Sequence, residues 1–496
     1  MRETSPDVPA RLRAALIAAD FTVDAVRELL GEVADAALLR NETTPALRRT
    51  AGDRGALATL TRLFLLQTTV RAEAAEAALP DLVDRLVAVG VLDRSVGEVA
   101  ARLDVRPYAT EDTALWVVSD LTPGLDGLPQ QVGADHVLGI SPASTSLAQL
   151  TLRGPVDSSL DLGTGCGVQA LHLAMHSSRV LATDVNQRAL GMARFNAGLN
   201  EVADRVEVRD GSFFEPMRGE RFDLIATNPP FVISPATGDR LVYRDSGLPG
   251  DRVVEDIVRA APDHLTEGGW CQVLANWVVE RDRPWDERLS SWLTPEVDAL
   301  VVQRELVDPA AYVELWLKDS GHHPATGGDP GEYRRRYDTW LSWLEEQRVE
   351  AIGFGWVNLR NGGGGRLAGR HDLWDWPYDV EQPIAPAIAE WADSVATEVS
   401  PDARLALRAD VRQETLGPAG GEDPETIVLR QQRGFRRARQ ADTVVAALAG
   451  ASDGELTVGQ LLDAVAQLLG REAAETRATY LPVVRELVDE GFLVAG

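Results

Sequence analysis

The chain has 496 residues, of which 45% are hydrophobic and 25% charged, and its 76 acidic and 49 basic side chains give a formal net charge of −27. This hydrophobic fraction excludes a wholly disordered or fibrous protein, and the length predicts roughly two to four domains. The acidity argues against a polyanion-binding surface that covers the whole chain. Lys318 is the only lysine, which nearly rules out a Schiff-base or phosphate-loop lysine.

Cysteine and histidine are too sparse for the common metal motifs. Cys166 and Cys271 supply neither a disulfide framework nor a CxxC zinc site, and the seven histidines contain no HExxH. We therefore expect no metal and a reducing compartment. The N-terminal apolar run is too short for a signal peptide, and no 18-residue apolar stretch predicts a membrane helix, so we expect a cytoplasmic protein.

Four segments differ in pattern along the chain. Residues 1–105 carry apolar residues at helical spacing and predict a helical domain, and residues 106–150 form a connecting segment with the strand-like run ALWVVSD. Residues 151–370 alternate strands with single helices, which predicts an α/β domain with a seven-stranded, doubly wound parallel sheet. Residues 371–496 return to helical spacing and predict a C-terminal domain that is mainly helical.

The two flanking domains contain a similar stretch of sequence. LPDLVDRLVAVGVLD begins at Leu79, and LPVVRELVDEGFLVAG begins at Leu481; each has the pattern of a helix followed by a short apolar exit. One interpretation is a winged-helix-like unit in each flank, in which a helix runs into a wing. The other is two amphipathic helices with ordinary C-terminal caps.

A glycine-rich turn follows the first predicted strand of the central domain. Asp161, Gly163, Gly165 and Gly167 form the pattern D-x-G-x-G-x-G, in which glycines allow a tight turn and close approach of a ligand. Val168 stands where a dinucleotide fingerprint needs its third glycine or alanine, which argues against NAD or FAD. The pattern instead resembles the first motif of class I S-adenosylmethionine (SAM) methyltransferases.

The next two strands agree with this resemblance. The second strand ends at Asp184, 23 residues after Asp161, where a carboxylate can accept both ribose hydroxyl hydrogens. Val185 is placed to lie against the adenine, and Asp210 or Ser212 follows the third strand where the family contacts the adenine edge. The resemblance implies that SAM is the cofactor and that these residues bind it.

The fourth strand runs into Asn228, Pro229, Pro230 and Phe231, which we predict to be the catalytic motif. The four residues resemble the (D/N)PP(Y/F) motif of N-methyltransferases that act on a planar NH2 group. The lone pair of such a nitrogen is delocalised, and acceptors for its two hydrogens, at the Asn228 side chain and the Pro229 carbonyl, would aim it at the methyl group. Phe231 would stack on the acceptor.

The resemblance covers roughly residues 135–365, and two branches of the superfamily are closest. Release-factor glutamine N5-methyltransferases usually end the motif with tyrosine, whereas the small-domain rRNA and adenine N-methyltransferases often end it with phenylalanine. Phe231 favours the second branch, but Val232 replaces the histidine common in the rRNA guanine enzymes. The resemblance implies a Rossmann-like sheet and leaves the acceptor open.

One cluster of basic residues is a candidate for binding nucleic acid. Arginine beside an aromatic ring can bind phosphates and stack on bases; the alternative is a solvated face paired to nearby acids. The cluster has Phe435 in its midst and consists of Arg430, Arg433, Arg436, Arg437 and Arg439.

The sequence thus predicts a SAM-dependent N-methyltransferase that acts on an exocyclic NH2 of a nucleic-acid base, with RNA favoured as the partner. A protein glutamine N5-methyltransferase with a basic protein substrate is the alternative within the same class. A SAM-binding adaptor without catalysis is the alternative of another class. Neither a metal nor a membrane enters any of these hypotheses.

Overall fold

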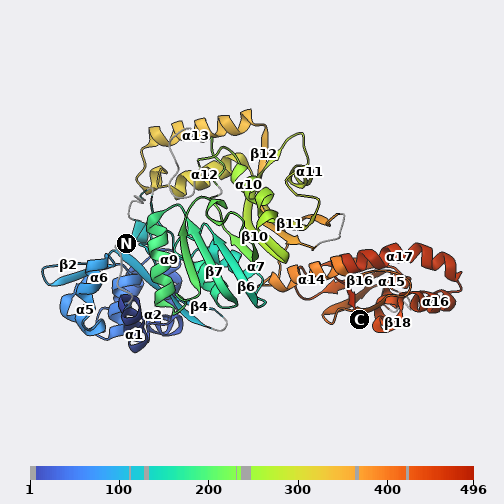
Figure 1. Cartoon of the computed structure of the whole chain (residues 1–496), viewed down its shortest axis with the longest axis horizontal. Helices are drawn as coiled ribbons and strands as arrows, with labels where there is room; N and C mark the ends of the chain where they lie inside the picture. Colours follow the sequence, from blue (N-terminus) through green and yellow to red (C-terminus); the bar gives the residue numbers. More distant parts are fainter. Residues whose placement is uncertain are drawn as a thin grey trace. The chain divides into compact units, whose positions relative to one another are not determined.

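The computed structural model describes residues 7–110, 113–127, 133, 135–230, 232–235, 247–363, 368–419 and 424–496. The chain divides into two compact units (Figure 1). The first unit consists of residues 1–148 and 153–376, and the second consists of residues 149–152 and 377–496.

The first unit begins with four helices, as the helical spacing of its apolar residues predicts. They are α1 (Asp7–Ala18), α2 (Val23–Leu38), α3 (Thr44–Thr50) and α4 (Ala56–Leu60). The Thr22 hydroxyl caps α2 by accepting a hydrogen bond from Ala25 N, and Gly31, at φ +71°, kinks this helix. Leu12 and Leu16 of α1 are fully buried in the core of this part.

Residues 61–101 have the order of elements found in winged-helix modules. The helical segment Thr61–Leu65 is followed by β1 (Val70–Arg71), α5 (Ala72–Ala78), α6 (Val83–Val89), β2 (Leu92–Ser95) and β3 (Glu98–Ala101). The strands form an antiparallel sheet in the order β1-β3-β2, and left-handed Gly97 turns β2 into β3. These strands depart from the all-helical expectation for residues 1–105, because two- to four-residue strands with polar side chains leave no alternation to recognise.

A hairpin follows the winged-helix module and packs on the central domain. It consists of β4 (Leu103–Ala109) and β5 (Ala114–Asp120), the strand-like run of the connecting segment. The outer edge of β5 faces α9 (Gln187–Leu199). There Asn200 bonds to the backbone of Trp116, and Asn196, one turn earlier on α9, bonds to that of Val118.

The central sheet has the strand order β13-β11-β12-β10-β9-β6-β7-β8 (Figure 1). Its strands are β6 (Val156–Leu162), β7 (Ser177–Asp184), β8 (Val206–Asp210), β9 (Phe222–Thr227), β10 (Leu265–Glu280), β11 (Val297–Val307), β12 (Val349–Asn361) and β13 (His371–Asp375). The expected doubly wound α/β fold is present: the run from β10 to β8 is parallel, and β12 lies antiparallel between β10 and β11.

The expected number of seven strands was wrong by one. β13 pairs in parallel with β11 and extends the sheet into the residues that the sequence pattern assigned to the C-terminal domain. Its sequence, HDLWD, is short and only half-buried at an edge, so it lacks the apolar run by which the inner strands were recognised.

Helices pack around this sheet. They are α7 (Pro142–Leu150), α8 (Val168–Ala174), α9, α10 (Arg252–Ala260), α11 (Trp285–Ser290), α12 (Pro309–Asp319) and α13 (Pro330–Glu346). The last two form an insertion between β11 and β12 and lie side by side at the top of Figure 1. Asp308 and Asp329 cap them, each followed by a proline that suits the first helical turn.

The second unit contains two small antiparallel sheets and four helices. The helices are α14 (Ala385–Ala396), α15 (Thr443–Ala451), α16 (Val458–Leu468) and α17 (Ala473–Asp489). One sheet joins β15 (Val411–Leu416), β16 (Thr426–Gln431) and β17 (Ala438–Ala441) in that order. In the other sheet, β14 (Arg404–Leu407) lies between β18 (Asp453–Thr457) and β19 (Leu493–Ala495).

The second of these sheets completes another winged-helix-like arrangement. In the second unit, α15, β18, α16, α17 and β19 follow one another. The helical segment Thr61–Leu65, β1, α5, α6 and β2 have the same order in the first unit. The central strand comes from β14, upstream in the chain, rather than from a returning wing strand. Both echoing stretches of sequence therefore form a helix followed by a strand.

Candidate functional site

The three glycines of the turn between β6 and α8 all have left-handed backbone: φ is +77° at Gly163, +55° at Gly165 and +89° at Gly167. A Cβ atom added to Gly163 or Gly165 would meet no described atom within 4 Å, whereas one at Gly167 would lie 3.1 Å from Ala193 Cα on α9. The first two glycines thus leave open space where a ligand can approach the backbone, and the third permits close helix packing.

Asp161, near the end of β6, turns its carboxylate toward the protein. Its Oδ2 accepts hydrogen bonds from Thr164 Oγ1 (2.5 Å) and Ala170 N (2.9 Å), and only 2% of the residue is exposed. Burial raises the pKa of this carboxyl to about 7, although both hydrogen bonds act in the opposite direction. Asp161 therefore ties the turn to the first residues of α8.

Asp184 ends β7 and contacts the same turn. Its Oδ2 accepts a hydrogen bond from Gly165 N and its Oδ1 accepts one from Asn186 N, both at 2.9 Å. Burial raises the pKa of Asp184; the backbone hydrogen bonds oppose this rise, and the nearby charge of Asp210 adds to it. These two hydrogen bonds thus fix the Asp184 carboxylate next to the open space that Gly165 leaves for a ligand.

The remaining residues predicted to contact the cofactor lie along the same edge of the sheet. Val185 is 64% exposed, which is unusual for an apolar side chain beside a buried strand. Asp210 ends β8 opposite Asp184, and Ser212 follows two residues later and is partly exposed. The ends of β6, β7 and β8 thus gather a glycine turn, two carboxylates and an exposed apolar side chain.

Asn228, Pro229 and Pro230 follow β9 beside that turn. Thr227, the last residue of β9, pairs with Leu162 of β6 and donates from Oγ1 to the Leu162 carbonyl (2.7 Å). Asn228 Oδ1 is buried and has no hydrogen-bond partner among the residues that the structure describes. A buried acceptor left unpaired costs about 1–3 kcal/mol, so it marks a place where a donor is expected to bind.

The rest of the motif adds rigidity but is not fully described. Pro229 is buried and Pro230 partly buried, and their rings restrict the backbone after Asn228. Phe231, the predicted stacking residue, lies outside the described residues.

The segment after the motif is held by residues that sequence reasoning missed. Ile233 N donates to Tyr312 Oη of α12 (2.8 Å), and Trp340 Nε1 of α13 donates to the Ile233 carbonyl (2.9 Å). No motif surrounds Tyr312 or Trp340 in the sequence. Their spacing on amphipathic helices signals burial but does not identify a partner so distant in the chain.

The arginine cluster of the second unit is largely neutralised. Three of its arginines form ion pairs at 3.2 Å or less: Arg430 with Glu414, Arg433 with Glu381 and Arg439 with Glu486. The Arg437 guanidinium lies over the ring of Phe435, which is only 6% exposed, and Arg436 is exposed. The buried ring is not available to stack on a base, and the pairing matches the alternative of a solvated face.

Within the described ranges, no group of three or more His, Cys, Asp or Glu side chains is arranged to hold a metal ion. No helix in the part of the chain that the structure covers has the length and apolar character needed to cross a membrane.

Two family models match the chain. Residues 140–291 match the methyltransferase small domain, and residues 18–102, which include the first winged-helix module, match a domain of unknown function, DUF7059.

Curated relatives match part of the chain. The chain is 38% identical over 132 residues to a release factor glutamine methyltransferase of Xylella fastidiosa, which covers 24% of this chain and 46% of that protein. It is 37% identical over 125 residues to a ribosomal protein uL3 glutamine methyltransferase of Bradyrhizobium diazoefficiens, covering 23% and 39%. The chain thus spans less than half the length of either relative.

Solved structures with similar folds include a ribosomal protein L11 methylase from Lactobacillus delbrueckii subsp. bulgaricus, with 20% identity, a TM-score of 0.22, and coverage of 28% of this chain and 63% of that chain. An rRNA methylase from Streptococcus thermophilus has 14% identity, a TM-score of 0.25, and coverage of 45% and 98%.

The turn, the strand order and the sequence matches agree with one another. Residues 140–291 are thus similar to the methyltransferase small domain, and the glycine turn and the doubly wound sheet of this region agree with that similarity.

Proposed function

We propose that the protein transfers a methyl group from SAM to a planar NH2 group held against Asn228, and that this group is the side-chain amide of a protein glutamine. The observation that carries the proposal is the buried Asn228 Oδ1, which lacks a partner among the described residues. An acceptor in that position suits a donor NH2 group.

The residues around the glycine turn fit SAM. The open space before Gly163 and Gly165 can receive the methionine part, the Asp184 carboxylate suits the ribose hydroxyls, and exposed Val185 suits the adenine face. We assign Asp210 and Ser212 to the adenine edge, and Asp161 and Gly167 to holding the turn. When bound, SAM supplies an electrophilic methyl group on a sulfonium.

The motif would prepare the acceptor nitrogen for attack. Asn228 Oδ1 accepts one hydrogen of the amide and the Pro229 carbonyl accepts the other, so the nitrogen can pyramidalise and free its lone pair. With its hydrogens held by Asn228 and Pro229, the nitrogen would be aimed at the methyl group that bound SAM would supply, with the sulfonium sulfur as the leaving group. The surplus proton leaves the cationic nitrogen for water afterwards, so no general base is needed before attack.

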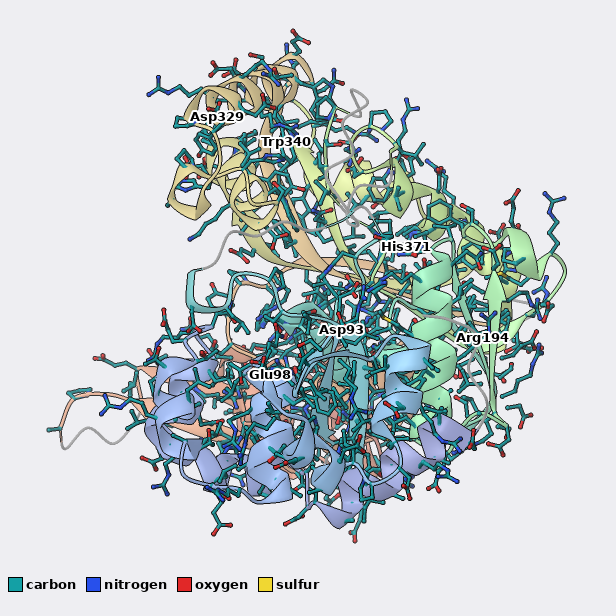
Figure 2. All side chains as sticks on the ribbon, turned by 90° about the vertical axis from the view of Figure 1, so that its left-hand side faces the viewer. Asp93, Glu98, Arg194, Asp329, Trp340 and His371 are labelled. Carbon is teal, nitrogen blue, oxygen red and sulfur yellow. The ribbon has the colours of Figure 1, made fainter. Side chains whose placement is uncertain are left out.

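The charge of the flanking parts supports a protein acceptor over a nucleic-acid base. Residues 72–101 of the first winged-helix module hold six acidic side chains and two arginines. Asp93 and Glu98 of its wing are exposed (Figure 2), and the Arg94 guanidinium is paired with Asp84. Phosphate binding requires uncompensated positive charge, and this face offers little.

The named relatives support the same choice. By their names, the release factor and uL3 relatives are glutamine methyltransferases, and both share 37–38% identity with about a quarter of this chain. We therefore place glutamine ahead of the base that the sequence alone favoured. The base remains a second candidate, because winged-helix-like modules on both flanks are an architecture used to hold nucleic acid.

Labelled SAM would decide between the acceptors. The wild-type protein is incubated with a purified bacterial release factor, with ribosomal protein uL3 and with total RNA in separate reactions. We expect label in protein, at glutamine, and none in RNA. Label confined to RNA would refute the glutamine proposal, and SAM binding without transfer to any acceptor would favour the adaptor hypothesis.

A further inference from the structure

Both backbone polar groups of Ile233 are bound by side chains of the α12–α13 insertion. Tyr312 Oη accepts from the Ile233 amide at 2.8 Å, and Trp340 Nε1 donates to the Ile233 carbonyl at 2.9 Å. Asn276 of β10 also donates to Tyr312 Oη, at 3.2 Å. Side chains from two helices thus fix Ile233, five positions after Asn228, and a side chain of β10 fixes one of them, Tyr312.

This contact is buried in a rigid aromatic cluster. Ile233 and Tyr312 are fully buried and Trp340 is 3% exposed. The Tyr312 and Trp340 rings meet edge to face at 6.2 Å, and Phe354 of β12 lies 6.0 Å from the Tyr312 ring. Figure 2 places Trp340 at the helices of the insertion. Hydrogen bonds in such surroundings are costly to break, because water cannot replace the lost partner.

A second set of contacts holds the chain at Gly250 and Asp251. Gly250 N donates to the Ser234 carbonyl at 3.2 Å, and Asp251, the next residue, forms a two-pronged ion pair with Arg288 at 2.8 Å. Ser234 and Asp251 are both buried. The backbone at Ser234 and the backbone at Gly250 are therefore held together beside the motif.

These contacts are separate from the cofactor half of the site. Outside its own helix, where it also interacts with Trp316, the Tyr312 side chain bonds to the segment after the motif and to β10, and Trp340 bonds to the same segment. The glycine turn and Asp184 are instead held by β6, β7 and α8. Loss of the Tyr312 hydroxyl should therefore disturb the positioning of the methyl acceptor more than it disturbs the binding of SAM.

We propose that Tyr312 and Trp340 are positioning residues for the methyl acceptor. They fix the backbone that leaves the Asn228 motif, so the α12–α13 insertion sets how precisely the NH2 group is held. This inference rests on the proposed function for its catalytic consequence, although the anchoring itself does not depend on which acceptor binds.

Steady-state methylation of a purified release factor tests the catalytic consequence. Tyr312→Phe keeps the ring and removes the hydroxyl, and we expect it to lower kcat/KM for the release factor about tenfold or more. The affinity for SAM, measured by calorimetry, should stay within about twofold. Trp340→Phe, which removes the indole donor, should act in the same direction.

Tyr337→Phe is the matched control. It removes a tyrosine hydroxyl from the same insertion, where Tyr337 donates to Glu314 at 3.1 Å and has no recorded bond to the segment after the motif. We expect it to behave as wild type. Equal kinetics for Tyr312→Phe and Tyr337→Phe, or a parallel loss of SAM affinity in Tyr312→Phe, would overturn the inference.

Hydrogen exchange separates this inference from the proposed function. In the full chain without acceptor, the peptide that contains Ile233 should exchange at least about tenfold faster in Tyr312→Phe than in wild type or Tyr337→Phe. Unchanged exchange overturns the inference whatever the acceptor is. If exchange accelerates but the wild type methylates no protein, the anchoring stands and the glutamine proposal fails.

Discussion

The side-chain amide of Asn196 on α9 pairs with the backbone of Val118 on β5 as a neighbouring strand would. Its Oδ1 accepts from Val118 N and its Nδ2 donates to the Val118 carbonyl, both at 2.8 Å, and Nδ2 also donates to the Cys166 carbonyl at 2.7 Å. One fully buried residue thus joins the N-terminal hairpin to the cofactor turn.

Replacing Asn196 with alanine should destabilise the first unit by about 2–5 kcal/mol, because buried backbone groups lose their partners. Thermal unfolding followed by calorimetry would measure the loss. Asn196→Asp retains an acceptor for Val118 N but loses both donated bonds, so it should also be less stable than wild type. A melting temperature unchanged in Asn196→Ala would contradict the proposed contribution of this contact.

The buried carboxyl of Asp161 should make stability depend on pH. Its pKa is raised to about 7 in the folded protein, so the folded state holds the proton more tightly than the unfolded state, and stability falls as pH rises from about 4 through 7. Between pH 5 and pH 7 the loss from this group is about 2 kcal/mol. Asp161→Asn removes this ionisable group. As pH rises, the free energy of unfolding of the variant should therefore increase relative to that of the wild type. If the free energies of unfolding of the two proteins changed with pH in parallel, Asp161 would not titrate in this way.

Asp184 should govern the affinity for SAM. Asp184→Asn weakens the acceptor that we assign to the ribose hydroxyls, and about tenfold weaker binding is expected by calorimetry. Because its pKa is raised, protonation on acidification begins at a higher pH than for an ordinary aspartate. As the pH is lowered, wild-type affinity should therefore fall more than that of Asp184→Asn; equal pH dependence would place the ribose elsewhere.

Asn228 should separate catalysis from cofactor binding. Asn228→Ala removes the buried acceptor and is expected to lower the rate of methyl transfer about 10²- to 10³-fold, with SAM affinity unchanged. Asn228→Asp keeps an acceptor oxygen and should retain more activity than alanine. If Asn228→Ala transferred methyl groups at the wild-type rate, the motif would have no part in the chemistry.

The cofactor half of the site could be predicted from the sequence because its signals are local. The second halves of β6, β7 and β9 are largely buried, and the strands lead into the glycine turn, end at Asp184 and run into Asn228, respectively. Neighbouring parallel strands then bring these ends to one edge. The direction of each side chain was not predictable: Asp161 turns inward to Thr164, whereas Asp184 holds the rim of the open space.

The acceptor half depends on contacts distant in sequence. Tyr312 and Ile233 are 79 residues apart, and Trp340 and Ile233 are 107 apart. Helical spacing predicts that such aromatic residues are buried, but one sequence contains no information on which loop they meet. The partners of the arginine cluster were not predictable for a similar reason, since the carboxylates of Glu381 and Glu486 lie about 50 residues away from the arginines that they pair with.

The central strand of the last sheet has a consequence for how the second unit forms. β14 pairs with β18 and β19, and its Leu407 meets Leu493 across the sheet. During synthesis, β14 emerges before both partners; β18 follows first, and the edge of β14 that pairs with β19 stays open until the chain has passed α17. Closing so long a loop is slow, and this unit should acquire its structure late and all at once, which makes it the part of the protein most exposed to chaperones and proteases.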